Sequence, residues 1–214
     1  MKLSRASLLH QKVPPDWYEK GIRNNLGQRF WHFKRFSEVG KLINSSGGKI
    51  LDIGSADGTF TKIILDKSCA NKVIGVDVLE SSVSYASNRF IKNKRLEFIK
   101  ADANKLPFKK DEFDAVFCLE VLEHVFSPKK VIEEVRRVLK NDGYAVFLVP
   151  SENLLFKFIW FFWVNTGGKV WQGTHLHHFN HHKLADLAKK NNFLVLKEKI
   201  FLLGMLKAVK IKKK

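Results

Sequence analysis

The chain has 214 residues, a formal net charge of +17 and 45% hydrophobic residues. This length predicts one domain, with or without extensions, that can bury a substantial core. Cys69 and Cys118 are too few for a disulfide framework, which favours a reduced, cytoplasmic compartment. We expect neither a signal peptide nor a membrane-spanning helix, because no apolar run is suitable for either.

The positive charge is concentrated in the two flanks of the chain. Residues 1–49 carry a net charge of +7 and residues 151–214 carry +9, whereas residues 50–150 carry only +1. Basic flanks that cover a substrate site favour an anionic partner, either nucleic acid or an anionic lipid surface. Solubility alone explains the same charge equally well.

Residues 1–48 predict an N-terminal helical arm that ends in a Ser/Gly-rich linker over residues 45–48. A row of apolar residues at near-helical intervals indicates one or two amphipathic helices, and a second aromatic row contains Trp31 and Phe36. The first row consists of Trp17, Ile22, Leu26, Phe30, Phe33 and Val39.

Strand-like and helix-like patterns alternate beyond the arm. This alternation predicts a parallel sheet with helices on both faces, in which ligands bind at the carboxyl ends of the strands. Ser127-Pro128 predicts a helix start, and residues 141–143 predict a turn. The expected strands are 49–53, 72–76, 95–99, 113–118 and 143–149, and the expected helices are 58–67, 80–91 and 128–139.

The end of the chain predicts a helix and an antiparallel hairpin. The helix is expected over residues 181–191, and the β-like runs 193–201 and 205–211 flank Gly204. The last three residues, 212–214, are lysines and form a basic tail.

The most informative segment is the expected turn after the first strand. That strand ends in Asp52, and Gly54 and Gly58 then lead into an amphipathic helix. Glycines allow close approach to the backbone, and a helix N-terminus offers free N–H groups and a positive dipole end. Asp77 ends the next strand, about 20 residues beyond the turn, where a carboxylate can accept both ribose hydroxyls. The segment therefore suits a nucleoside-bearing ligand.

The glycine spacing fits neither a dinucleotide fingerprint nor a Walker loop. It resembles the first motif of the class I S-adenosylmethionine-dependent methyltransferases, an acidic residue followed by x-Gly-x-Gly-x-Gly. Asp52, Gly54 and Gly58 match this motif, and Ala56 replaces the middle glycine.

The resemblance covers residues 49–211. It implies an α/β, Rossmann-like fold with a mostly parallel seven-stranded sheet, closed by an antiparallel C-terminal hairpin and covered by helices on both faces. It also implies S-adenosyl-L-methionine as the cofactor, with its methionine part at the glycine turn and its amino group near Asp52. A tight structural turn is the alternative explanation of these glycines.

The resemblance assigns two further cofactor contacts. Asp102 follows the third strand, where the family places an acceptor for the adenine amino group, and the backbone N–H of Ala103 would meet the ring. A solvent-exposed Asp at a turn is the alternative for Asp102. Leu119 and Glu120 end the fourth strand. In the family, the last residues of this strand face the cofactor's sulfonium and the incoming substrate.

The sequence Glu-Val-Leu-Glu-His-Val over residues 120–125 resembles the type 11 branch of the family, which includes ubiquinone and menaquinone enzymes and acts mostly on small molecules and lipids. An oxygen or carbon acceptor needs a base, and His124 is the first candidate because imidazole titrates near neutrality. His175 is the second candidate, and Glu120 completes the expected catalytic set.

Glu120, Glu123 and His124 also have the spacing of one helical face. The small-RNA 2′-O-methyltransferases hold Mg²⁺ with Glu-x-x-Glu-His and a distant histidine, and some quinone O-methyltransferases carry the same motif. A metal here is the minor hypothesis, and histidines that pack or line a substrate mouth are the favoured one. The downstream histidines are His175, His177, His178, His181 and His182.

An apolar insert follows the fifth expected strand. It spans about residues 151–180, and its segment 154–164 carries a single charge, Lys157. Trp, Phe and a flanking Lys suit a membrane interface, and tail 212–214 would add attraction to anionic lipid. A lid over the active site or a dimer interface is the alternative.

These observations predict a methyltransferase that acts on a small hydrophobic or lipid-linked acceptor at the membrane surface. The alternative is an RNA methyltransferase that uses the basic flanks. No RNA-recognition signature supports that alternative, and the charge is diffuse.

Overall fold

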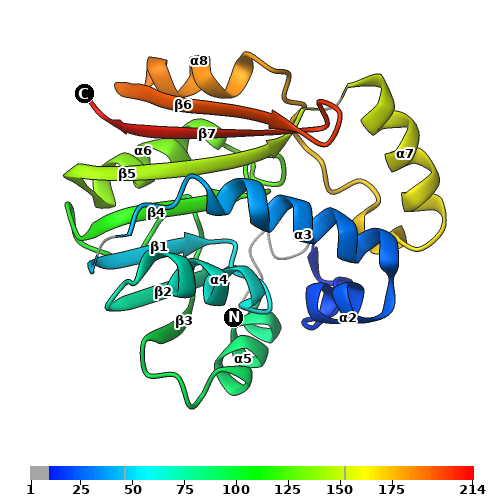
Figure 1. The fold of residues 1–214 in the computed structure, drawn as a ribbon, viewed down its shortest axis with the longest axis horizontal. Coiled ribbons are helices and arrows are strands. Elements are labelled where there is room, and N and C mark those ends of the chain that lie inside the picture. Colours follow the sequence, from blue (N-terminus) through cyan, green and yellow to red (C-terminus); the bar gives the residue numbers. More distant parts are fainter. Residues whose placement is uncertain (1–9, 46, 152) are drawn as a thin grey trace.

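The computed structural model describes residues 10–45, 47–151 and 153–214. A seven-stranded sheet in the order β3-β2-β1-β4-β5-β7-β6 runs through the molecule (Figure 1). β1 to β5 pair in parallel, whereas β7 pairs antiparallel with both β5 and β6. The predicted fold class is confirmed. The strands are β1 Lys49–Ile53, β2 Lys72–Asp77, β3 Leu96–Lys100, β4 Phe113–Leu119, β5 Leu139–Pro150, β6 Phe193–Phe201 and β7 Leu206–Lys213.

Helices cover both faces of the sheet because its central strands are apolar on both sides. Side chains alternate along a strand, so Leu51 and Ile53 pack in one apolar core with α6 and α8, while Ile50 packs in the other with α3 and α4. The helices are α2 Trp17–Asn24, α3 Leu26–Gly40, α4 Thr59–Ser68, α5 Glu80–Arg89, α6 Pro128–Val138, α7 Leu154–Asn165 and α8 Lys183–Lys190, with a short 3₁₀ helix η1 at Lys169–Trp171.

The local signals around α6 have two outcomes. The start of the helix is confirmed, since the Ser127 side chain accepts a hydrogen bond from the Lys130 N–H and Pro128 occupies the first turn. The separate turn predicted at residues 141–143 is wrong, because these residues lie inside β5. Leu139 pairs with Phe113 and Tyr144 with Ala115, so residues 140–143 are accommodated as an irregularity of the ladder.

In its described residues the N-terminal arm contains helices α2 and α3, but the buried face of α3 differs in part from the predicted apolar row. Val39 of that row is buried as predicted. Leu26, Phe30 and Phe33 are exposed instead, whereas His32 and Arg35 are buried. The side of α3 that carries His32 and Arg35 faces the interior. The reason is the ion pair that Arg35 forms with Glu120, the residue after β4.

The predicted basic tail is largely part of the sheet. Lys212 and Lys213 lie in β7, and Lys213 Nζ is 2.5 Å from Asp111 Oδ1. The C-terminus lies at the opposite end of the sheet from α7 (Figure 1). Lys212 and Lys213 therefore do not lie beside the apolar insert, where they were expected to add attraction to anionic lipid.

Gly58 makes the β1–α4 turn possible. It precedes α4 with a φ of 76°, a left-handed conformation that side chains rarely adopt. A Cβ atom at this position would lie 2.7 Å from Phe98 Cζ and 2.8 Å from Phe90 Cε2. Both the backbone and the neighbouring rings therefore require glycine.

We expect Gly58→Ala to lower the free energy of unfolding by about 2–4 kcal/mol, because it adds left-handed strain to overpacking. Denaturant unfolding measures this change. Gly167→Ala is the matched control: no heavy atom lies within 4 Å of its added Cβ, so its effect should stay within about 0.5 kcal/mol. Equal effects of the two substitutions would contradict the role of Gly58.

Candidate functional site

A cavity lies at the carboxyl ends of β1, β2, β3 and β4, where ligands bind in open parallel sheets. It brings together most of the residues expected to bind the cofactor. Those that line it are Gly54, Ala56, Asp77, Asp102 and Ala103. Asp52, Gly58 and Leu119 lie outside the lining of this cavity.

Asp77 ties the glycine turn to the end of β2. Its Oδ2 accepts a hydrogen bond from the Ala56 N–H at 3.0 Å, and its Oδ1 accepts one from the Leu79 N–H at 2.9 Å. Burial raises the pKa of Asp77, and the backbone donors Leu79, Ala56 and Val78 oppose that rise. The same carboxylate therefore shapes the turn and lines the cavity.

Gly54 places the turn against the β4–α6 loop. Its φ is 77°, and an added Cβ would collide with the side chain of Val121. This close approach lets Val121 line the cavity beside the turn.

Asp52 and Asp102 have different surroundings from one another. Asp52 is buried and accepts a hydrogen bond from Thr61 Oγ1 at 2.6 Å, which joins β1 to α4. Burial raises the pKa of Asp52 to about 7, against the effect of the Thr61 hydrogen bond. Asp102 lines the cavity, and its Oδ1 accepts the Asn104 N–H at 2.8 Å.

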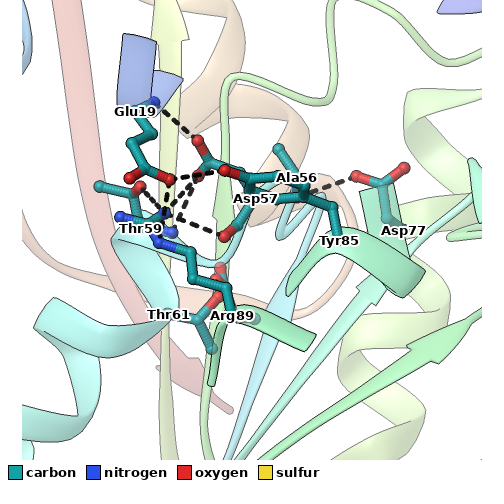
Figure 2. A network of polar contacts seen from close by, with 9 residues as sticks. Glu19, Ala56, Asp57, Thr59, Thr61, Asp77, Tyr85 and Arg89 are labelled. Carbon is teal, nitrogen blue, oxygen red and sulfur yellow. Dashed lines mark hydrogen bonds and ion pairs between the residues drawn. The ribbon is translucent and has the colours of Figure 1, made fainter. Parts of the chain in front are cut away.

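The N-terminal arm covers the cavity and is fastened to the glycine turn (Figure 2). The Glu19 N–H donates to Asp57 Oδ2 at 2.7 Å, and Arg89 Nη1 donates to Thr59 Oγ1 at 2.7 Å. Tyr85 and Arg89 of α5 both contact the Glu19 carboxylate, at 2.8 and 3.2 Å. Three segments distant in sequence thus meet at one edge of the site.

A second cavity of ≈ 340 Å³ adjoins the first and lies between α3, α7 and the loop after β4. The two cavities share Glu120 and His124. Seven of the 18 residues that line this second cavity are Trp, Tyr or Phe, and charged and polar side chains including Arg35, Glu120 and Glu123 line part of the rest. Aromatic walls with a few polar groups are typical of sites for small molecules. The aromatic members include Trp17, Trp31, Phe156, Trp160, Trp163 and Trp171.

Glu120 lies at the junction of the two cavities in a strained conformation. Its φ is 56°, and its carboxylate pairs with Arg35. The Arg35 guanidinium lies 5.5 Å from the Tyr18 ring centroid, and burial raises the pKa of Tyr18 to about 12. Because Glu120 is paired in this way, it positions the wall of the site and is not a free proton acceptor.

His124 is held as a neutral imidazole at pH 7. Burial, with smaller contributions from His10 and His175, lowers the pKa of His124 well below its usual value, which differs from the titration near neutrality expected from the sequence. Its Nδ1 lies 2.9 Å from the Thr174 carbonyl oxygen. A carbonyl only accepts, so Nδ1 carries the proton and Nε2 keeps its lone pair.

The metal hypothesis is altered by the geometry. Glu123, His124 and His175 each offer one ligand atom, and these atoms lie within 4.8 Å of one another. Glu120, expected in this set, is engaged by Arg35 instead. One carboxylate and two imidazoles suit Zn²⁺, and the Thr174 carbonyl orients His124 as ligating histidines require. Among the described residues, the four histidines from 177 to 182 do not join this group.

Sequence reasoning missed several residues of the site. Arg35 was visible only as one basic residue in an aromatic helix, and nothing in its spacing indicated a buried partner. Trp171 and Tyr18 come from segments without a family motif, and both line the shared wall of the cavities. Their roles depend on long-range packing.

Comparison with known proteins gives a consistent result. Residues 51–147 match the model of a methyltransferase domain family, type 11. The chain is 38% identical over 101 residues to a demethylmenaquinone methyltransferase of Clavibacter sepedonicus, which covers 47% of this chain and 40% of that protein. It is 32% identical over 157 residues to a mitochondrial ubiquinone biosynthesis O-methyltransferase of Schizosaccharomyces pombe, covering 62% and 54%.

The chain spans about half the length of the curated relatives it matches. Its fold is similar to that of a Haloferax volcanii complex of a methyltransferase with the Trm112 methyltransferase activator. That match has a TM-score of 0.75 at 16% identity and covers 94% of this chain and 97% of the other.

The matched segment contains strands β2, β3 and β4, Asp77 as the last residue of β2, and Asp102 just after β3, and the cavity lies at the carboxyl ends of these strands. Residues 51–147 are therefore similar to the methyltransferase domain of the type 11 family, and the fold around them is similar to that of S-adenosylmethionine-dependent methyltransferases.

Proposed function

We propose that this protein transfers a methyl group from S-adenosylmethionine to a small hydrophobic or lipid-linked acceptor. The observation that carries the proposal is the aromatic cavity of ≈ 340 Å³ that adjoins the cofactor cavity at His124. An aromatic wall excludes water and favours an apolar acceptor. The names of the relatives, from menaquinone and ubiquinone biosynthesis, agree with an acceptor of this class.

The cofactor would be held by the residues that line the first cavity. Asp77 would accept the ribose hydroxyls, Asp102 the adenine amino group, and the backbone at Gly54 and Ala56 would approach the methionine part. Asp52 would not contact the cofactor, because its carboxylate accepts a hydrogen bond from Thr61 and does not line the cavity. It would instead hold the glycine turn in position. When bound, the cofactor supplies an electrophilic methyl group on a sulfonium.

The protein contributes position and a base. The aromatic cavity orients the acceptor, and its apolar surface keeps water away. His124 Nε2 takes the proton that an oxygen or carbon acceptor loses, while Nδ1–H stays bonded to the Thr174 carbonyl. Glu120 and Arg35 hold the wall against which the acceptor lies.

We expect Asp77→Ala to weaken S-adenosylmethionine binding by about 1.5–3 kcal/mol, the scale of hydrogen bonds to a charged group. Calorimetry with the cofactor and its demethylated product measures the change. Asp66→Ala is the matched control, because Asp66 is an exposed carboxylate paired with Lys62 on α4. Unchanged affinity in Asp77→Ala would remove Asp77 from the ribose site.

We expect His124→Ala to lower kcat by about 10²- to 10⁴-fold, as for loss of a general base, while cofactor affinity is retained. Transfer of a labelled methyl group to a prenylated quinol measures the rate. His182→Ala, at an exposed histidine before α8, should leave the rate unchanged. A wild-type rate in His124→Ala would exclude His124 as the base.

The base and metal hypotheses for His124 predict different responses to a chelator. For a base we expect full turnover in excess chelator. Turnover that is lost on chelation and restored by Zn²⁺ or Mg²⁺, with lower metal content in Glu123→Ala, would assign Glu123, His124 and His175 to a metal instead.

A further inference from the structure

Helix α7 presents an uncovered apolar face. Its inner side is formed by Phe156 and Val164, which are buried, with Trp160 and Trp163 half-buried beside them. Its outer side is exposed and apolar, the reverse of the usual surface helix. The exposed members are Leu154, Leu155, Phe158, Ile159, Phe161 and Phe162, and Phe158 and Phe161 are 64% and 63% exposed.

The tip of the β6–β7 hairpin extends this face. Leu203 is 81% exposed, and its carbonyl accepts a hydrogen bond from Asn153 Nδ2 at 3.0 Å, just before α7 begins. Figure 1 shows the hairpin tip beside the start of α7, on the side of the molecule away from the C-terminus. We call α7 and Leu203 together the apolar platform. A contiguous exposed surface of this kind marks an interaction site.

The platform borders the aromatic cavity. Ile159 is both exposed on α7 and part of the cavity lining, next to Trp160 and Trp163. A molecule held against the platform therefore lies at the mouth of the cavity.

The charge around the platform is positive. Residues 153–185 contain three lysines and no acidic residue. Lys157 lies on α7 and Lys169 follows it in η1, and both are exposed. Neither side chain forms an ion pair with a carboxylate of the described residues, so both are available to an external anion.

We propose that the apolar platform is a docking surface for an anionic membrane. Aromatic and aliphatic side chains flanked by lysines are the combination that inserts into the headgroup boundary. Helix α7 has 12 residues, and none of the helices in the described ranges is long and apolar enough to cross a bilayer, so α7 would lie in the interface. Docking to a membrane does not depend on the proposed function. Only the further step, in which an acceptor dissolved in the membrane enters the cavity, rests on it.

A second copy of the chain fits the platform less well. Each copy would bring the same lysines and a net charge of +17 to a symmetric contact, so that like charges would face one another. An anionic lipid surface complements both the apolar side chains and the lysines.

The test is co-sedimentation with vesicles of equimolar phosphatidylcholine and phosphatidylglycerol. We expect the wild-type protein to sediment with them, and the variant Phe158→Ser/Phe161→Ser/Phe162→Ser to lose at least about tenfold in partition coefficient. None of these three residues lines either of the two cavities described above. The control Ile91→Ser/Leu194→Ser/Leu196→Ser changes three exposed apolar residues elsewhere and should bind like the wild type.

Salt and charge provide a second arm of the test. Lys157→Glu should weaken binding at low salt, and this difference should shrink at high salt while the apolar contribution remains. Wild-type protein that ignores the vesicles, or equal loss in the control variant, would overturn the proposal. So would a dimer that the Phe→Ser variant dissociates, or RNA binding that depends on the platform and falls steeply with salt.

The docking surface and the proposed function can fail separately. Calorimetry with S-adenosylmethionine verifies that each variant is folded and binds the cofactor. Vesicle binding without transfer to any hydrophobic acceptor would overturn the acceptor class alone. Transfer to a dispersed acceptor by a protein that does not bind vesicles would overturn the docking surface alone.

Discussion

The hydrogen bonds of the Asp77 carboxylate are the interaction on which the site depends. A buried carboxylate needs donors, and the N–H groups of Ala56 and Leu79 provide them from two separate turns. These bonds fix the glycine turn against the end of β2, and the left-handed conformations at Gly54 and Gly58 make the turn tight enough for α4 to follow directly. The open cavity at the carboxyl ends of the strands is the consequence.

The N-terminal arm completes the site from the other side. It brings Glu19 to the glycine turn and Arg35 to Glu120, so both cavities acquire a wall that the sheet alone cannot provide. A charge left alone in this apolar interior would be costly, and pairing Arg35 with Glu120 offsets that cost. The pair therefore couples the position of α3 to the end of β4, where the two cavities meet.

The insert after β5 serves two surfaces at once. The inner side of α7 supplies Phe156, Trp160 and Trp163 to the aromatic cavity, and its outer side stays apolar and uncovered. A helix that is apolar all round normally lies inside a protein or against lipid. Here one layer of protein separates the cavity from the outer surface, which is the arrangement that the proposed membrane-dissolved acceptor requires.

The sequence by itself determined the sheet, the glycine turn and the acidic residues after β2 and β3, because each depends on local pattern: alternation, turn chemistry and helix starts such as Ser127-Pro128. It also singled out the apolar insert. Only the tertiary structure decided that Leu26 and Phe30 face outward while Arg35 is buried, and that Glu123, His124 and His175 converge while Glu120 pairs elsewhere. These features join segments about 50 to 85 residues apart, and no local periodicity records which distant partner a buried charge or an imidazole will find.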